Sequence, residues 1–373
     1  MVEHPGERLG RSDYIERVEA KVVEIRLKKR WKISLYEADV RRHAIVRIVT
    51  ASGVEGWGEA SPSPAFMGES ADTVKTVVER HLAPVLVGAD PISIGAIHAR
   101  MDAAIHGNEA AKSAVDMAVY DVIGKTLGVR VCDLLGGRVR ERVPLSWVVG
   151  IQGDDDALEE AVRFADMGFK VIKVKVGSEP DRDVRVVKEI WDAVGGRARL
   201  RLDANQGYDV PTAIQAMRKI EEICPVECLE QPIPRWNIEG LREVKRAIRT
   251  PIMVDEAIFG VHDAFKVAAA GAADIVNIKI GKVGGLYPAL KVAAIAEAAG
   301  MKCAVGSNLE LGIGSAAAIH FAASVPVVKI AGDLAIGPFL HERDLIEPGL
   351  TELISNGEAL PPTGNGLGVS VSV

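Results

Sequence analysis

Charged side chains stand where strand-like segments in the middle of the chain end, and their types are those of acid–base catalysis. The segment VIKVKVG at 171–177 is apolar and β-branched apart from Lys173 and Lys175, which is typical of a strand. Side chains alternate along a strand, so both lysines lie on the same face. Strands this apolar are usually buried on both faces, so two ammonium groups that point the same way indicate a chemical role.

The next strand-like segments also end in charged residues. Asp203 ends LRLD, Glu230 ends ECLE, Asp255 ends IMVD, and Lys279 follows VNI. From Lys175 onward these positions are 24 to 28 residues apart, which matches one strand plus one helix. In a barrel of parallel strands the carboxyl ends meet at one face, where barrel enzymes build their sites. We therefore expect these side chains to lie together.

Three carboxylates in one place need a cation. Asp203, Glu230 and Asp255 would repel one another, and burial would raise their pKa values. Oxygen ligands without His or Cys suit Mg²⁺, with Mn²⁺ as the second candidate. The lysines would flank the metal. A lysine beside a cation and another lysine should have a lowered pKa, so that it can act as a base.

This set predicts chemistry next to a substrate carboxylate. The metal would hold the carboxylate, a lysine would remove the proton from the adjacent carbon, and the metal would stabilise the resulting enediolate. Lys173 and Lys175 come before the carboxylates in strand order and Lys279 comes after them, so lysines flank the substrate on two sides. A proton can leave one face and return on the other, or one lysine can act while the other only stabilises charge.

Each residue alone also has an ordinary explanation. A Lys-x-Lys strand can be a solvated edge, Asp203 could cap a helix, and Glu230 could belong to a buried ion pair. Lys279 and Lys282 could bind phosphate, as loops after late barrel strands often do. A barrel that binds a ligand or metal without catalysis is the other class of protein that these residues allow. The joint spacing of the strand ends favours catalysis.

Residues around this set have secondary roles. Asn205 and Gln231 follow two of the carboxylates and are expected to orient them, with loop capping as the alternative. Glu310, in a loop at the same barrel end, either meets the substrate or is solvated. Trp147 and His320 are more typical of core packing.

A βα repeat must position these residues. Eight strand-like segments with helical patterns between them predict a parallel barrel in 141–349. Residues 1–140 form an antiparallel meander followed by helices, with 28–39 and 61–70 as mobile segments, and 350–373 return to this part, where GVSVSV could pair with its sheet. The barrel strands are expected at 143–149, 169–176, 198–203, 226–230, 252–255, 274–279, 302–306 and 328–332.

Composition excludes several partners. The 373 residues are 48% hydrophobic and 26% charged with a net charge of −6, which suits a globular protein without a nucleic-acid surface. No apolar run reaches the roughly 20 residues of a membrane span. The N-terminal 13 residues lack the apolar core of a signal peptide, and the four cysteines are scattered, so we expect a cytoplasmic protein with reduced thiols.

The motifs together resemble the enolase superfamily, in its muconate lactonizing enzyme subgroup. The matching segments are KVK (173–175), LDANQ (202–206), LEQP (229–232), VDE (254–256), IKIGKVGG (278–285) and GSNLELGIG (306–314). The resemblance implies an α/β fold: a (β/α)7β TIM-like barrel with an α+β N-terminal capping domain that the C-terminal tail completes. It also implies a small-molecule carboxylate substrate and a homo-oligomer, either a dimer or an octamer.

The resemblance assigns roles to individual residues. It implies that 28–39 and 61–70 close over the substrate. It implies Mg²⁺ ligands at Asp203, Glu230 and Asp255, acid–base lysines at Lys175 and Lys279, electrostatic or carboxylate-binding help from Lys173, and a loop glutamate at Glu310.

The subgroup contains muconate cycloisomerases, racemases and epimerases of N-acyl amino acids or dipeptides, and o-succinylbenzoate synthases, which share these catalytic residues. Residues 331–348 resemble the cycloisomerases, and Asp333-Leu334-Ala335 lacks the Asp-x-Asp pair typical of dipeptide epimerases. RLDANQG and HFAAS resemble the epimerases instead. We interpret the chain as a cycloisomerase first, with a racemase or epimerase as the close alternative.

Overall fold

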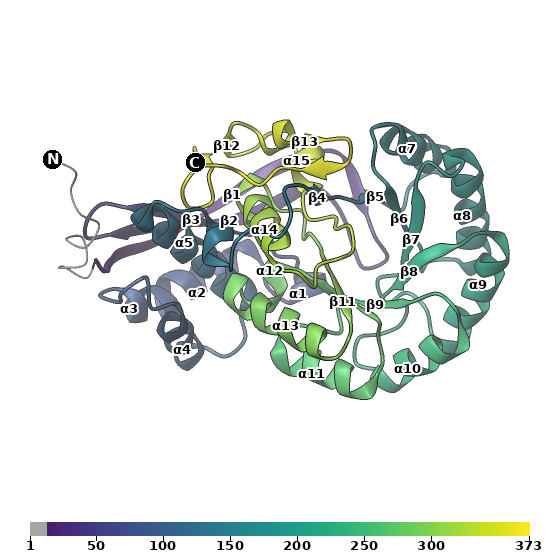
Figure 1. The fold of residues 1–373 in the computed structure, drawn as a ribbon, viewed down its shortest axis with the longest axis horizontal. Coiled ribbons are helices and arrows are strands. Elements are labelled where there is room, and N and C mark those ends of the chain that lie inside the picture. Colours follow the sequence, from purple (N-terminus) through teal and green to yellow (C-terminus); the bar gives the residue numbers. More distant parts are fainter. Residues whose placement is uncertain (1–12) are drawn as a thin grey trace.

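The computed structural model describes residues 13–373 (Figure 1). The expectation about a signal peptide concerns residues that mostly lie outside this range. An elongated N-terminal part stands beside a round barrel, whose helices form an outer ring (Figure 1). Within 13–373, no helix is both long and apolar enough to cross a membrane.

The N-terminal part is a three-stranded antiparallel sheet covered by helices. The sheet has the order β1 (Ile15–Lys32), β2 (Glu37–Thr50), β3 (Glu55–Ala60). Helix α5 (Glu109–Leu127) packs on β3, and a Cβ at Gly56 or Gly58 would lie within 2.1 Å of an α5 carbonyl oxygen, so glycine permits this approach. The other helices are α1 (Pro64–Met67), α2 (Ala71–Val77), η2 (Val78–Leu82), α3 (Ala83–Leu86), α4 (Ile94–Ala104) and α6 (Val131–Leu134).

The hairpin of β1 and β2 is longer than the sequence pattern predicted. Most of the segment 28–39, expected as a mobile loop, lies in these two strands, and only residues 33–36 form the turn. Trp31 and Ile33 are buried while the charged residues beside them point outward, so the alternation of a strand continues through this basic stretch. That expectation was wrong because the charges concealed the alternation.

Seven parallel strands form the barrel wall in chain order. They are β5 (Trp147–Val149), β6 (Val171–Lys175), β7 (Arg199–Asp203), β8 (Val226–Glu230), β9 (Ile252–Val254), β10 (Ile275–Ile278) and β11 (Lys302–Val305). The predicted eighth strand is reduced to two parallel bridges, Cys303 to Val328 and Leu145 to Gly332, which join β11 to the chain before β5. The barrel is therefore closed by an irregular last segment.

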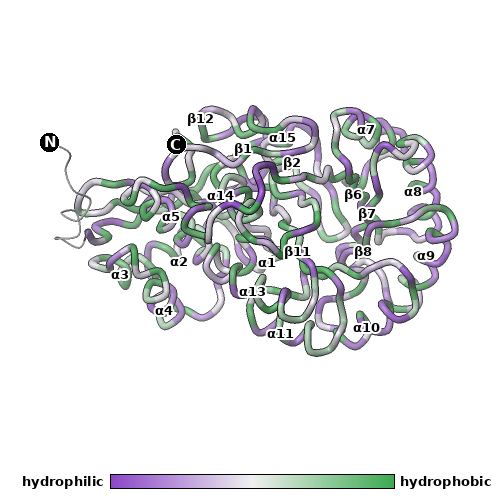
Figure 2. The backbone as a smooth tube through the Cα atoms, in the orientation of Figure 1, coloured by the Kyte–Doolittle hydropathy of each residue, from purple (hydrophilic) through white to green (hydrophobic). Residues whose placement is uncertain are grey.

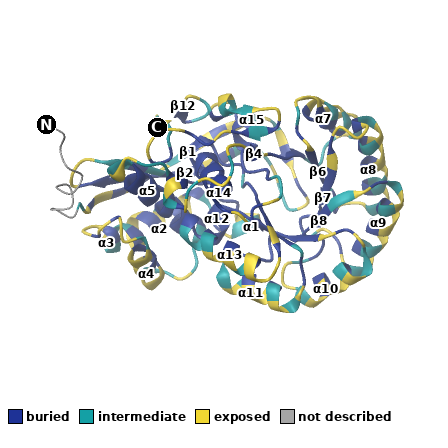
Figure 3. Cartoon of the chain, in the orientation of Figure 1, coloured by how far each residue is buried: buried dark blue, intermediate teal, exposed yellow. Residues whose placement is uncertain are grey.

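Helices follow the strands and cover the barrel. They are α7 (Asp154–Asp166), α8 (Pro180–Val194), α9 (Val210–Ile223), α10 (Ile238–Ala247), α11 (Val261–Ala270), α12 (Ile280–Val283), α13 (Leu286–Ala298), α14 (Gly312–Ser324) and α15 (Gly337–Leu340). Helices α7 to α11 bury one face and expose the other, whereas α14 is buried along its whole length (Figure 3). Apolar and polar stretches alternate around the outer ring accordingly (Figure 2).

The C-terminal tail returns to the N-terminal part, but not to its sheet. Strand β15 (Ser370–Val371) pairs with β12 (Ile346–Glu347), so the predicted pairing of GVSVSV with the N-terminal sheet was wrong. The tail instead meets α5, where the backbone N–H of Leu367 donates to Asp121 Oδ1 at 2.8 Å. The remaining elements are η3 (Leu350–Leu353) and a small sheet of β13 (Ile354–Ser355), β14 (Glu358–Ala359) and β4 (Val143–Pro144).

Candidate active site

Parallel pairing places the first charged residues side by side. Lys175 ends β6, Asp203 ends β7 and Glu230 ends β8, and the register pairs Lys175 with Asp203 and Asp203 with Glu230. Lys175 Nζ lies 2.5 Å from Asp203 Oδ2 and 2.7 Å from Asn205 Oδ1. The alternation along β6 therefore points Lys175 into the barrel mouth, as the sequence pattern predicted.

Lys173 is the centre of a buried ion cluster. Its Nζ lies 2.9 Å from Asp333 Oδ2, 3.2 Å from Glu230 Oε2 and 3.4 Å from Asp203 Oδ2, and its side chain is 1% exposed. Burial opposes its charge, but the three carboxylates together hold the pKa of Lys173 well above its usual value. Lys173 is thus a fixed positive charge inside the barrel.

Asp255 follows β9 and is held by two lysines. Lys279 Nζ lies 2.8 Å from Asp255 Oδ2, and Lys282 Nζ lies 2.8 Å from Asp255 Oδ1. Burial opposes the charge of Asp255, yet Lys279 and Lys282 lower its pKa. Burial and the neighbouring Lys279 lower the pKa of Lys282, whereas Asp255 raises that of Lys279 against burial. In this arrangement the lowered lysine pKa expected from the sequence belongs to Lys282, which the sequence had suggested only as a phosphate ligand.

The two predicted amides hold the loops after the strands. Asn205 accepts a hydrogen bond from Lys175 and donates one to Glu256 Oε1 at 3.0 Å. Gln231 Oε1 accepts the backbone N–H of Asp255 at 3.1 Å and of Ala257 at 3.0 Å. Gln231 therefore positions the backbone of Asp255, whereas the carboxylate of Asp255 pairs with Lys279 and Lys282.

Three further polar residues lie at this end of the barrel that the sequence had not assigned to the site. Glu256 is buried, and burial followed by the charge of Asp255 raises its pKa to about 8. Asn277 Nδ2 donates to Glu230 Oε1 at 2.7 Å, and Asp333 pairs with Lys173. Asp333 could have been predicted because it directly follows the last barrel segment, as the other charged residues follow their strands. Asn277 could have been predicted from the alternation of side chains, because it stands two residues before Lys279.

Glu310 is neither solvated nor directed into the pocket. Its Oε2 accepts from Ser307 Oγ at 2.6 Å and from the backbone N–H of Asn308 at 2.8 Å, and burial raises its pKa. Ser307, Asn308 and Leu309 line the pocket in its place. Glu310 thus stabilises the loop whose other residues face the pocket. Of the residues expected in the core, Trp147 stacks on Phe164, and His320 is buried in α14.

A second buried cluster joins the N-terminal sheet to this loop. Glu59 on β3 accepts the backbone N–H groups of Leu311 at 2.7 Å and Gly314 at 2.8 Å, and contacts His43 Nδ1 at 2.9 Å. Burial raises the pKa of Glu59 to about 7. His43 Nε2 lies 3.2 Å from His341 Nε2. The start of α14 is therefore anchored to the N-terminal part.

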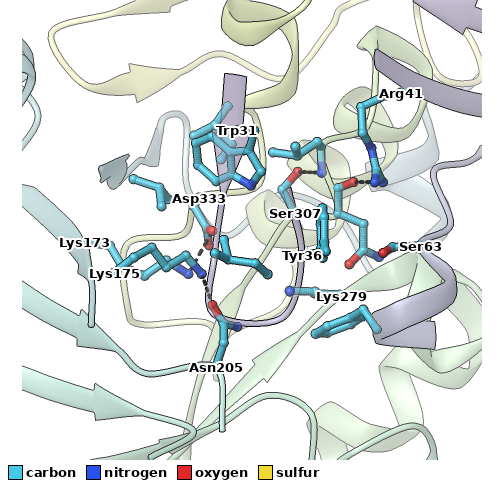
Figure 4. Close-up of a pocket in the computed structure, with 16 residues that line it drawn as sticks. Trp31, Tyr36, Arg41, Ser63, Lys173, Lys175, Asn205, Lys279, Ser307 and Asp333 are labelled. Carbon is cyan, nitrogen blue, oxygen red and sulfur yellow. Dashed lines mark hydrogen bonds and ion pairs between the residues drawn. The ribbon is translucent and has the colours of Figure 1, made fainter. Parts of the chain in front are cut away.

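One pocket lies where the N-terminal part covers the barrel mouth (Figure 4). Trp31, Ile33 and Tyr36 reach it from the hairpin of β1 and β2. Ser63 and Phe66 reach it from the segment 61–70. Its barrel side carries Lys173, Lys175, Asn205, Lys279 and Asp333. The segments 28–39 and 61–70, which the family resemblance expected to close over a substrate, therefore both border the pocket.

The three carboxylates at the strand ends suit a magnesium ion in type and burial, although in this structure each is paired with a lysine. Asp203, Glu230 and Asp255 are buried oxygen donors at the ends of three neighbouring strands, and burial, followed by the charges of Asp203 and Asp255, raises the pKa of Glu230. Across residues 13–373, no three His, Cys, Asp or Glu side chains form a ready metal cluster. The carboxylates would have to turn from the lysines to share one cation.

The fold and this pocket define an α/β barrel protein with lysines and carboxylates at the strand ends, capped by an N-terminal domain. Family models agree: residues 17–136 match the mandelate racemase / muconate lactonizing enzyme N-terminal domain, and 156–372 match the enolase C-terminal domain-like family. The chain belongs to the enolase superfamily, in its muconate lactonizing enzyme subgroup.

Individual relatives include both muconate cycloisomerases and epimerases. The L-Ala-D/L-Glu epimerase of Clostridium acetobutylicum is 35% identical over 325 residues, which cover 87% of this chain and 90% of the relative. The muconate lactonizing enzyme of Pseudomonas fluorescens, solved with muconolactone, has a TM-score of 0.93 and 34% identity over 97% of this chain and 98% of its own. The dipeptide epimerase of Enterococcus faecalis V583, solved with Mg and L-Leu-L-Tyr, has a TM-score of 0.90 and 33% identity over 96% and 99%.

Proposed function

We propose that this protein removes the proton next to a substrate carboxylate and passes through an enediolate. The observation that carries the proposal is the strand order of the charges. Lys175 ends β6 and Lys279 follows β10, while Asp203, Glu230 and Asp255 stand at the ends of the strands between them. A carboxylate substrate in this pocket would therefore have a lysine toward each side.

The proposed roles follow from the contacts. Asp203, Glu230 and Asp255 would hold Mg²⁺, with Mn²⁺ as a substitute. The bound ion would supply the positive charge that stabilises an enediolate. Lys175 and Lys279 would exchange the proton with the substrate, and each contacts one carboxylate here, Asp203 or Asp255. Lys173 would supply fixed charge next to the substrate carboxylate.

Two reactions fit this chemistry. Muconate cycloisomerisation is the first candidate, because the segment after the last barrel strand carries Asp333-Leu334-Ala335 and so lacks an Asp-x-Asp pair. Racemisation or epimerisation of N-acyl amino acids or dipeptides is the second, and the presence of lysines after both β6 and β10 favours it. A racemase needs both lysines, whereas a cycloisomerase needs one for proton transfer.

Deuterium incorporation tests the proposal. Muconate, N-succinyl amino acids and dipeptides would each be incubated with the protein and Mg²⁺ in D2O and followed by proton NMR. We expect exchange or turnover of at least one compound, with Lys175→Ala and Lys279→Ala each reducing it by roughly 100- to 10,000-fold in a racemase. Unequal losses would identify a cycloisomerase. Lys188→Ala, at an exposed position on α8, is the control. No exchange by any carboxylate would contradict the proposal.

A further inference from the structure

Asp116, on α5 of the N-terminal domain, holds the start of a barrel helix. Its Oδ1 accepts the backbone N–H of Leu286 at 2.6 Å, and its Oδ2 accepts that of Tyr287 at 3.3 Å. These are the first two residues of α13, and Gly285, which precedes them, has no side chain that could cap the helix. The fully buried Asp116 supplies this cap instead. A helix of the barrel is therefore capped by the other domain.

Two glycines allow α5 to come this close. Gly284 and Gly285 have φ values of 94° and 121°, which glycine adopts without strain. A Cβ on Gly285 would overlap the side chain of Asp116, and one on Gly284 would lie 2.6 Å from Glu109 Oε2. Glu109 and Asp116 both belong to α5. The glycine pair in the motif IKIGKVGG thus leaves room for two acidic side chains of the N-terminal domain.

The single turn of α12 connects this cap to Lys279. The backbone oxygen of Lys279 accepts the N–H groups of Lys282 at 2.9 Å and Val283 at 3.2 Å. The N–H of Gly285 donates to the backbone oxygen of Ile280 at 3.0 Å. These hydrogen bonds hold the backbone from Lys279 to Gly285 as one unit. A shift of the start of α13 would therefore move Lys279.

A second contact fixes the direction of Asp116 itself. His98 Nε2, on α4, lies 2.7 Å from Asp116 Oδ2, and both side chains are buried. The ring of His98 also lies 5.1 Å from that of Tyr287. Rotation of Asp116 away from α13 would break its contact with His98, so α4 and α5 together fix the position of the cap.

The two proposed acid–base lysines are held in different ways. Lys175 is the last residue of β6 and pairs with Asp203 of β7 in the register of the sheet. Lys279 lies one residue beyond β10 and reaches the pocket from the start of α12 (Figure 4). A displacement of about 1 Å in a reacting group can slow a reaction by about 100-fold. Lys279 therefore depends on the turn of α12, whereas Lys175 depends on the sheet.

We propose that Asp116 is a positioning residue for Lys279: by capping α13 from the N-terminal domain, it fixes the turn that carries this lysine into the pocket. The inference rests on the proposed function, which gives Lys279 a part in proton transfer. It adds that the N-terminal domain places one acid–base lysine and leaves the other to the barrel sheet.

A purely structural role of Asp116 makes a different prediction, and Asp121 provides the matched control. Asp121 is another buried carboxylate of α5. It accepts the backbone N–H groups of Trp57 at 2.9 Å and Leu367 at 2.8 Å, which belong to β3 and the C-terminal tail. Loss of either carboxylate should destabilise the fold, but only loss of Asp116 should displace Lys279 relative to Lys175.

Two measurements test the proposal on the wild type, Asp116→Ala, Asp116→Asn and the control Asp121→Asn, all with Mg²⁺ present. Acetylation by acetic anhydride, followed by mass spectrometry, gives the rate of modification of Lys279 relative to Lys175 in the same molecules. Exchange in D2O would be followed for both stereoisomers of N-succinylalanine and for L-Ala-L-Glu and L-Ala-D-Glu. Lys175→Ala and Lys279→Ala assign each lysine to the isomer that it deprotonates.

We expect the ratio of Lys279 to Lys175 acetylation to rise several-fold in Asp116→Ala, because a displaced Lys279 loses its buried contact with Asp255. The rise should be smaller in Asp116→Asn, which keeps an acceptor for Leu286, and absent in Asp121→Asn. Exchange of the isomer assigned to Lys279 should fall by roughly 10- to 100-fold in Asp116→Ala, while the other isomer keeps its rate.

An unchanged acetylation ratio in the folded Asp116 variants would overturn the proposal, and so would equal losses of exchange for the two isomers. If the ratio changes but no compound exchanges deuterium in the wild type, the proposed function fails and the role of Asp116 in placing Lys279 stands. If the wild type exchanges deuterium and the ratio is unchanged, the proposed function stands and the role of Asp116 fails.

Discussion

The ammonium of Lys279 lies 4.4 Å from the ring centre of Phe66. Lys279 follows a barrel strand, whereas Phe66 belongs to α1 in the N-terminal domain. The same ring lies 6.1 Å from that of Phe259, in the loop after β9. The segment 61–70 therefore covers a proposed acid–base lysine with an aromatic face, which favours the charged lysine and excludes water from it.

Removal of this ring should affect substrate use more than stability. We expect Phe66→Ala to raise KM or lower kcat/KM several-fold, because the lysine becomes solvated and the cover over the pocket is lost. Phe66 is only partly buried, so the free energy of unfolding should change by no more than about 1 kcal/mol.

Steady-state kinetics and urea unfolding on the same variant separate these effects. Phe66→Leu is the matched control, since it keeps the apolar cover and loses the aromatic face. Unchanged kinetics in Phe66→Ala would show that the segment does not cover the substrate.

Lys173 should contribute strongly to stability in the absence of metal. Lys173→Met leaves Asp203, Glu230 and Asp333 buried without their shared cation. Loss of one partner from a buried ion cluster costs roughly 3 to 5 kcal/mol. Urea unfolding in EDTA measures this loss. Lys188→Met, in an exposed pair with Asp192, should cost far less, because solvent screens an exposed ion pair. Equal losses of unfolding free energy in the two variants would show that the buried ion cluster around Lys173 does not stabilise the fold.

The strand-end residues were predictable because local rules determine them. Alternation along β6 decides that Lys173 and Lys175 share a face, and the βα spacing brings Asp203 and Glu230 beside them. These relations hold whatever the side-chain conformations are. The sequence therefore predicted the barrel and the side-by-side placement of the ends of β6, β7 and β8.

The contacts between distant elements were not predictable in this way. Which lysine pairs with which carboxylate depends on side-chain directions across the barrel, so the role of Lys282 beside Asp255 was missed. Arg41 and Arg42 are adjacent on one strand, and only the packing of the N-terminal domain on the barrel decides that Arg41 is buried. Glu310 was placed at the right barrel end, but its hydrogen bonds within the loop were not foreseen.

Magnesium should compete with the lysines for the carboxylates. We expect Mg²⁺ to raise the melting temperature of the wild type, because a ligand that binds only the folded state stabilises it. Asp203→Asn, Glu230→Gln and Asp255→Asn should each weaken Mg²⁺ binding by tenfold or more, on the order seen when the surroundings of a metal site are disturbed. Calorimetric titration measures this change. Glu222→Gln, an exposed position in α9, is the control. Full Mg²⁺ affinity in all three variants would place the metal elsewhere.

The buried His320 should make the protein less stable in mild acid. Its Nε2 donates to the backbone oxygen of Leu367 at 3.1 Å, and burial lowers its pKa to about 4. Because the folded pKa lies below the unfolded value of about 6.5, the unfolded chain binds the proton first as the pH falls. Stability is therefore fully present above pH 6.5 and is lost between about pH 6.5 and 4, by about 3 kcal/mol over the whole window.

Unfolding by urea at several pH values tests this sign by comparison with His320→Gln, which keeps a donor for Leu367 but does not titrate. As the pH falls from 6.5 to 4, the free energy of unfolding of the wild type should decrease more than that of His320→Gln. The opposite slope from Glu59, whose pKa burial raises to about 7, is common to both proteins and cancels. His262→Gln, at an exposed position, should follow the wild type. Parallel curves for the wild type and His320→Gln would show that His320 protonates as readily in the folded chain as in the unfolded one.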